Sequence, residues 1–155
     1  METFDNDDFR SACNETFSIK EGKILEKNRN FFSQFHAYFK EFLLITNFGN
    51  IIRIIDWFLE NYSKKHNIHY GINESREFYV YDEYQIQLNN YTRLYFDPFC
   101  RNKKIFCKYQ DEEKEMVFLS SIGQINFFRW AIENGVIKYV KIHLNEIKDD
   151  MISKK

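Results

Sequence analysis

The sequence predicts an α+β fold, with an N-terminal helical hairpin, a three- to four-stranded antiparallel β-meander and a C-terminal helix pair. Three observations support this order. Apolar residues recur at helical spacing in residues 30–62, alternate with polar residues in residues 77–88, and return to helical spacing after residue 121. At 155 residues the chain has the length of one domain, so we expect a flexible acidic N-terminal segment over residues 1–22 and a single α+β domain over residues 23–155.

Two amphipathic stretches predict the helical hairpin. In "FFSQFHAYFKEFLLI", Phe31, Phe35 and Tyr38 fall on one stripe of a helix, and Ile51 and Ile55 begin a similar stripe in "IIRIIDWFLENY". The glycine-containing "TNFGN" between them interrupts the pattern. These features predict two antiparallel helices joined by a short turn, followed by a loop over "SKKHNIHYGINESR".

The middle of the chain has the alternation typical of strands. In "EFYVYDEYQIQL", Val80, Tyr84, Ile86 and Leu88 share one face of an extended chain, which predicts a strand with one wet face. A second strand is predicted at "YTRLYF", ended by an Asp-Pro pair. The stretches "KIFCKY" and "EMVFL" flank a charged "QDEEK" and predict a β-hairpin.

The C-terminal part has a helix start and a helix stop. Ser121 precedes Gln124 by three residues, which is the spacing of a capping box, and Gly135 suits the left-handed position after a helix. A further helix is predicted beyond it. The helix between these signals is apolar on most sides, so we expect it to fill the core rather than to read DNA bases. Arg129 is one of its few residues suited to water.

Composition narrows the functional classes. The formal net charge is −1, so no overall positive field attracts nucleic acid, and any such site must be a local patch. The three cysteines are an odd, unclustered set, which favours a reducing compartment over a disulfide framework. The acidic N-terminus lacks the apolar region of a signal peptide, and no apolar run is long enough to span a membrane. We therefore expect an intracellular protein that is not secreted and has no membrane partner.

No recognisable catalytic set is present in the sequence. We find no nucleophile elbow, HExxH motif, P-loop or GxGxxG motif, so no catalytic residue and no cofactor are predicted, although an enzymatic activity stays open. His66, His69, Cys100 and Cys107 could together ligate zinc, but the gap between the cysteines differs from the usual short spacing. We therefore predict no metal site.

One local cluster of basic residues has the chemistry of single-stranded nucleic-acid binding. Cations that contact phosphates are interleaved there with aromatic rings on which bases stack. The candidate residues are Arg93, Arg101, Lys103, Lys104 and Lys108. The alternative interpretation is that the lysines cover the wet face of an edge strand and prevent strand pairing between molecules.

The stretch "SIGQINFFRWAIENGVIKYV", with the preceding "YFDPFCRNKKIFCKY", resembles segments of uncharacterised proteins of nucleocytoplasmic large DNA viruses. This resemblance implies a viral source, and with it a location in the host cytoplasm or the virion, and it carries no activity or site residue. The abundance of Phe, Tyr, Ile, Asn and Lys, all encoded by AT-rich codons, agrees with such a source.

We therefore expect a non-enzymatic viral protein that acts by protein–protein interaction, as a virion or host-interaction component. Its partner is another protein or a second copy of itself. Tyr79 and Tyr81, on the wet face of the predicted strand, and Arg129 are the candidate contact residues, because tyrosine and arginine are enriched at interfaces. The alternative function is that of a nucleic-acid-binding accessory protein that uses the basic and aromatic hairpin patch.

Overall fold

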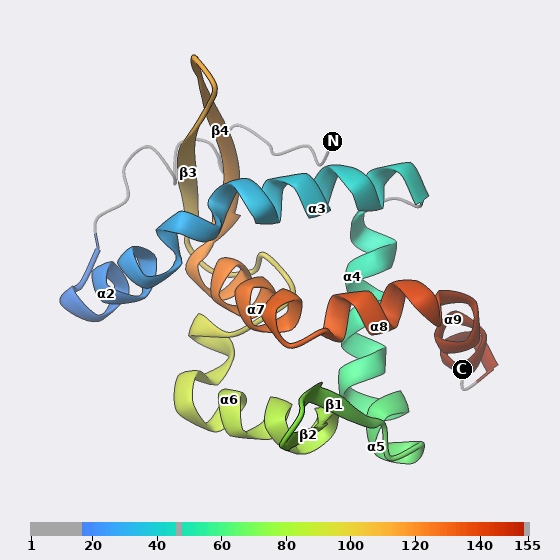
Figure 1. Cartoon of the computed structure of the whole chain (residues 1–155). Coiled ribbons are helices and arrows are strands. Elements are labelled where there is room, and N and C mark those ends of the chain that lie inside the picture. The colour runs from blue at the N-terminus through green and yellow to red at the C-terminus, as the bar shows by residue number, and fades with distance from the viewer. Residues whose placement is uncertain (1–16, 46–47, 154–155) are drawn as a thin grey trace.

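The computed structural model describes residues 17–45 and 48–153, and it confirms the α+β class (Figure 1). The N-terminal half contains α2 (Ile19–Asn28), a 3-10 turn (Arg29–Phe31), α3 (Phe32–Ile45), α4 (Phe48–Trp57), a π-helical turn (Phe58–Tyr62) and α5 (Ser63–Lys65). The remainder contains β1 (His69–Asn73), β2 (Arg76–Tyr79), α6 (Val80–Tyr95), β3 (Lys104–Asp111), β4 (Lys114–Ser121), α7 (Ile122–Glu133), α8 (Val136–Ile142) and α9 (Leu144–Ser153).

The predicted boundary at residue 22 falls inside a helix. Ser18 caps α2 by accepting a hydrogen bond from the backbone of Glu21, whose side chain accepts one from the backbone of Ser18. This reciprocal capping box starts the helix at Ile19. Residues 19–22 are therefore helical in the structure. Residues 1–16 of the predicted flexible segment lie outside the described residues, and the single domain over residues 23–155 stays a prediction.

The expected strand over residues 77–88 is wrong for most of its length, because Val80–Tyr95 form α6. The same residues that alternate also satisfy a helical stripe: Val80, Tyr84, Leu88 and Tyr91 are spaced by four, four and three positions. Ile86 separates the two interpretations, since a strand would bury it beside Tyr84, and the structure leaves it 51% exposed. The second expected strand, "YTRLYF", covers the end of this helix.

β1 and β2 make up the first sheet. β1 lies within the predicted loop, and β2 begins at the last residue of that loop. β1 and β2 pair in antiparallel fashion, with Tyr70 opposite Phe78. Their stacked rings, 5.5 Å apart, face the C-terminal helices, where Tyr70 also stacks on Tyr139 and Phe78 approaches Trp130. The sheet content is therefore two separate two-stranded hairpins in place of one meander.

The predicted β3–β4 hairpin is confirmed, and it projects past α3 in Figure 1. Its base docks on α3 through Phe118, whose ring lies 5.5 Å from that of Phe35 and stacks at 4.7 Å on His36. The Nδ1 of His36 is 2.6 Å from the hydroxyl of Tyr109. A mostly buried imidazole therefore holds the second hairpin against the helical layer.

Protonation of the buried His36 is expected to make the stability of the protein depend on pH. Burial, together with the positive charge of Lys40, lowers the pKa of His36 below its ordinary value of 6.5. The unfolded chain then binds more protons than the folded chain just below that value, so stability falls as the pH falls through this range. We expect urea unfolding to give a lower free energy at pH 5.5 than at pH 7.5. His36→Phe keeps the stacked ring and should flatten the difference, and an unchanged difference would count against this role.

α7 is the central core helix, as the sequence predicts, and it contacts α2, α3, α6 and α8. Ser121 caps it by accepting from the backbone of Gln124 at 3.1 Å. The Gln124 side chain does not complete a capping box: it accepts from Ser120 and donates to the carbonyl of Pro98. Gly135, with φ of 73°, turns the chain from α7 into α8.

Candidate interaction surfaces

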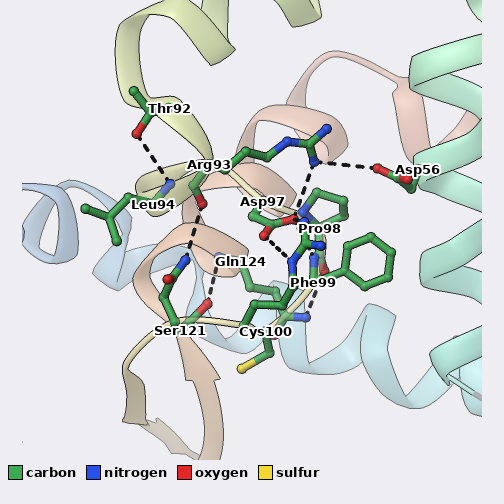
Figure 2. Close-up of polar contacts among 12 residues, drawn as sticks. Asp56, Thr92, Arg93, Leu94, Asp97, Pro98, Phe99, Cys100, Ser121 and Gln124 are labelled. Atoms are coloured by element: carbon green, nitrogen blue, oxygen red, sulfur yellow. Dashed lines mark hydrogen bonds and ion pairs between the residues drawn. The ribbon is translucent and has the colours of Figure 1, made fainter.

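The segment between α6 and β3 is anchored on one buried carboxylate (Figure 2). The side chain of Asp97 is only 2% exposed. Its oxygens accept hydrogen bonds from the backbone of Phe99 at 3.1 Å and from Nε and Nη2 of Arg101 at 2.9 and 3.0 Å. A buried carboxylate is costly unless such partners satisfy it. Asp97 thus fixes the course of the chain after α6.

Arg93 reaches the same carboxylate from the other side. Its Nη1 lies 3.6 Å from oxygens of both Asp97 and Asp56, and its Nη2 donates to Glu60. The hydroxyl of Tyr84 donates to Glu60 at 3.0 Å. Burial raises the pKa of Asp56, and the charge of Arg93 opposes that rise. Acidic and basic groups therefore compensate one another here, as in a structural ion network.

The backbone that places Arg93 in this network is strained. Thr92 has φ of 58° and ψ of 174°, inside a stretch otherwise counted as α6. A β-branched residue rarely adopts this conformation, which costs about 1–3 kcal/mol and is accessible to glycine. The kink redirects the chain so that Arg93 faces Asp56 and Asp97 (Figure 2).

Thr92→Gly is expected to stabilise the protein by about 1 kcal/mol, because it relieves this strain at a smaller entropic cost. Thr92→Ala removes the branched side chain and keeps the positive φ, so it should gain less. Urea denaturation of the three proteins checks the order. A glycine variant less stable than the alanine variant would contradict the strain.

The three candidate lysines are divided between internal contacts and solvent. Lys103 lies 3.3 Å from Glu21, and Lys104 donates to the backbone carbonyl of Cys100. Lys108 is exposed on β3. The hydrogen bond from the Ser18 backbone lowers the pKa of Glu21, which keeps the carboxylate charged beside Lys103. The five predicted cations therefore do not form one free positive patch.

The four residues considered for zinc are not brought together. His66 lies 4.0 Å from Asp150, while His69 lies 3.5 Å from Glu77 on the β1–β2 hairpin. Cys107 is buried in the core, and burial raises its pKa. Within residues 17–45 and 48–153, no group of three or more His, Cys, Asp or Glu side chains is arranged to hold a metal ion. Across the same residues, no helix combines the length and apolar character needed to span a bilayer.

Tyr79 and Tyr81 lie beside each other in space, although they belong to different elements. Tyr79 ends β2, is 41% exposed and stacks on His69 at 4.8 Å. Tyr81, in the first turn of α6, lies under the ammonium of Lys64 at 5.2 Å. Both line a pocket of about 220 Å³ with residues of α5 and the loop that follows it. The two tyrosines thus share one surface, although Tyr81 belongs to a helix and not to the predicted strand, and their role as contact residues stays a prediction.

Arg129 has a structural role in the fold. Its guanidinium donates to the side chain of Asn28 on α2 and, at 2.8 Å, to Glu133 one turn along α7. Asn28 is buried and also donates to Asn126 at 3.3 Å. Only 21% of the Arg129 side chain is exposed. Arg129 therefore joins α7 to α2, and its role as a contact residue stays a prediction.

A larger hollow of about 460 Å³ lies between β1 and the C-terminal helices α7 and α8. Its walls come from Tyr70, Gly71 and Ile72 of β1, from the α7–α8 junction, from α8 and from Tyr38 of α3. We call this hollow the β1 groove. Ile142, at its rim, is 67% exposed. The hydroxyl of Tyr70 donates to the carbonyl of Asn134 at 2.7 Å, which fixes the hairpin over the junction.

The β1 groove is the surface that the sequence did not reveal. Its walls come from segments that are far apart in the chain, and β1 lay in a predicted loop. The available signals were the glycine at position 135 and the exposed isoleucine at the end of α8. Neither signal identifies a groove without the position of the hairpin.

Comparison with known proteins confirms the resemblance to uncharacterised proteins of large DNA viruses. Residues 5–155 match the family described as "Family of unknown function (DUF7197)". The chain is similar to an uncharacterised protein of Acanthamoeba polyphaga mimivirus, with 49% identity over 148 residues. The alignment covers 91% of the chain and 57% of the mimivirus protein, so the chain spans little more than half of that relative's length. No solved structure matches the chain.

Proposed function

The chain belongs to the DUF7197 family of unknown function, and from this premise we propose that it is a viral protein that acts by binding another protein. The observation that carries the proposal is the β1–β2 hairpin, whose two strands each contribute residues to a hollow. The exposed Tyr79 and the half-buried Tyr81 line one hollow, and the exposed Ile142 lines the other. Tyrosine and exposed aliphatic side chains next to concave surfaces are typical of protein interfaces. A role in the virion or in contact with the host agrees with the 49% identity to a mimivirus protein.

The nucleic-acid alternative has less support from the geometry. Arg93 and Arg101 share the buried Asp97, and Lys103 is paired with Glu21. Counterion release needs cations that are available to phosphates, and these three already have carboxylate partners. Lys108 remains exposed on β3, close to the acidic turn of its hairpin.

The carboxylate partners of these cations predict the outcome of a retention experiment. Replacing both Lys103 and Lys108 with Glu is expected to leave elution from single-stranded DNA and RNA columns unchanged. The physical reason is that neither side chain belongs to a continuous positive surface. A wild-type protein that is retained, with retention that falls steeply with salt and is lost in the double variant, would instead support the alternative.

Affinity purification with matched variants tests the protein-binding proposal. Tagged wild-type protein is recovered from infected host cells and compared with Tyr79→Ser/Tyr81→Ser by quantitative mass spectrometry. Val117→Ser is the control, because Val117 is 44% exposed on the other hairpin. We expect a specific partner that is lost with the tyrosine variant and kept with the control. A monodisperse monomer that recovers no partner would overturn the proposal.

A further inference from the structure

The β1 groove has an open strand edge along one wall. The backbone N–H of Val80 donates to the carbonyl of Ile68 at 3.2 Å, which makes these two residues a hydrogen-bonded pair of the β1–β2 ladder. Such pairs alternate along antiparallel strands, so Tyr70 and Phe78 form the next one. The N–H and C=O groups of His69 and Gly71 therefore point away from β2.

These outward groups make no backbone hydrogen bond with another described residue. Gly71 is exposed, and a Cβ atom added there would meet only the carbonyl of Asn73, at 3.8 Å. The groove is lined by three consecutive residues of β1 and by no residue of β2, so it lies on the side of this free edge. A row of unpaired backbone groups is a template for another strand.

The groove also has one uncompensated charge. Lys138 on α8 is exposed, lines the groove, and makes no ion pair with a described residue. The other charged wall residue, Glu133, is already paired with Arg129 at 2.8 Å. The remaining walls are largely apolar and aromatic, with Ile72, Ile132 and Tyr139 among them. The groove thus combines a free strand edge, an apolar hollow and a single available cation.

We propose that the β1 groove binds an extended peptide of a partner protein, which adds a strand to β1, places an apolar side chain in the hollow and a carboxylate beside Lys138. This inference rests on the proposed protein-binding function and deepens it. In such strand addition, main-chain bonds to His69 and Gly71 supply affinity, and alternate side chains of the peptide supply specificity. The hollow of about 460 Å³ accepts the side chains that point toward it.

A second copy of the chain is a poorer occupant. If two copies paired through β1, each concave groove would face the other, and both hollows would stay unfilled. The two Lys138 side chains would also line the joined grooves, where the one carboxylate that each copy contributes, Glu133, is already paired with Arg129. A peptide that protrudes from its parent protein avoids both penalties.

The test uses a random linear peptide library displayed on phage, selected against the full chain. We expect enriched peptides to carry an acidic residue and alternating apolar residues. The Kd of a synthetic enriched peptide should rise at least tenfold with Gly71→Pro, which removes the outward N–H, and with Lys138→Glu. Gly71→Ala, which keeps the N–H and has room for the methyl group, should bind as the wild type does. Lys148→Glu, exposed on α9, is the charge control.

N-methylation of alternate peptide amides provides a measurement that does not depend on folding of the proline variant. Binding should fall at least tenfold for one alternating set of amides and not for the other. No enrichment, or equal binding to wild type and Gly71→Pro, would overturn the proposal, as would a wild-type dimer that Gly71→Pro dissociates. A partner that is lost with Tyr79→Ser/Tyr81→Ser but kept with both Gly71→Pro and Lys138→Glu would leave the protein-binding function standing and reject the groove as its site.

Discussion

Asp97→Ala is expected to lower the free energy of unfolding by about 3 kcal/mol, because it removes the acceptor of several charge-assisted hydrogen bonds from a buried position. Asp97 accepts from the backbone of Phe99 and from two nitrogens of Arg101, and it lies 3.6 Å from Arg93. Its loss leaves the buried Nη1 of Arg93 with Asp56 alone, at 3.6 Å. The segment that follows α6 would also lose its anchor.

Urea denaturation measures this change in the free energy of unfolding, and two further variants are compared with Asp97→Ala. Asp111→Ala removes an exposed carboxylate at the tip of the β3–β4 hairpin, so its effect should stay within about 0.5 kcal/mol. Arg101→Ala should cost less than Asp97→Ala, because the arginine side chain is 57% exposed and its removal leaves Asp97 near Arg93. If Asp97→Ala were as mild as Asp111→Ala, the buried network would not hold this segment in place.

Local signals predicted the C-terminal half well. The cap at Ser121, the left-handed turn at Gly135 and the β3–β4 hairpin each depend on residues within a few positions of one another. Their geometry is set by the backbone preferences of those residues. For this reason the sequence alone predicted the central helix, both of its ends and the hairpin that precedes it.

The strand prediction for the central region was wrong because the apolar residues there fit the period of a strand and the period of a helix at once. Val80, Tyr84 and Leu88 fit a strand face and a helical stripe equally well. Only Ile86 distinguishes the two, because a strand would bury it and the helix leaves it exposed. Its exposure depends on where α5, the π-helical turn and α7 pack against α6, which local propensity does not contain. β1, in turn, is stabilised by the stacking of Tyr70 on Tyr139, a contact across almost half of the chain.

The sequence did not reveal the carboxylate partners of the candidate basic residues, for a related reason. Arg93, Arg101 and the lysines were grouped by their neighbourhood in the sequence, which reveals cations but not their partners. Asp56 and Glu60 reach Arg93 from the α4 region, and Glu21 reaches Lys103 from α2. A positive stretch of sequence therefore became a compensated network once the helices packed. The placement of Tyr79 and Tyr81 depended less on the error in secondary structure. Both tyrosines lie at the surface whether the segment is a strand, as predicted, or the start of α6, as observed.

Phe127→Ala is expected to lower the free energy of unfolding by about 3–5 kcal/mol, because it leaves a cavity at the centre of the core. Phe127 is fully buried on α7, and its ring packs within 5.3 Å of Phe96 and 5.2 Å of Phe128. Trp130 packs against the same cluster. Phe127→Leu retains most of the volume and should cost about 1 kcal/mol.

The position of Phe127 decides between the two roles considered for its helix. A recognition helix would tolerate loss of an aromatic side chain and lose binding, whereas a core helix loses stability. Glu133→Ala, on the exposed end of the same helix, is the control and should change stability by about 0.5 kcal/mol or less. Denaturant unfolding followed by tryptophan fluorescence gives all three values. If Phe127→Ala were as stable as Glu133→Ala, α7 would not be the helix around which the other elements pack.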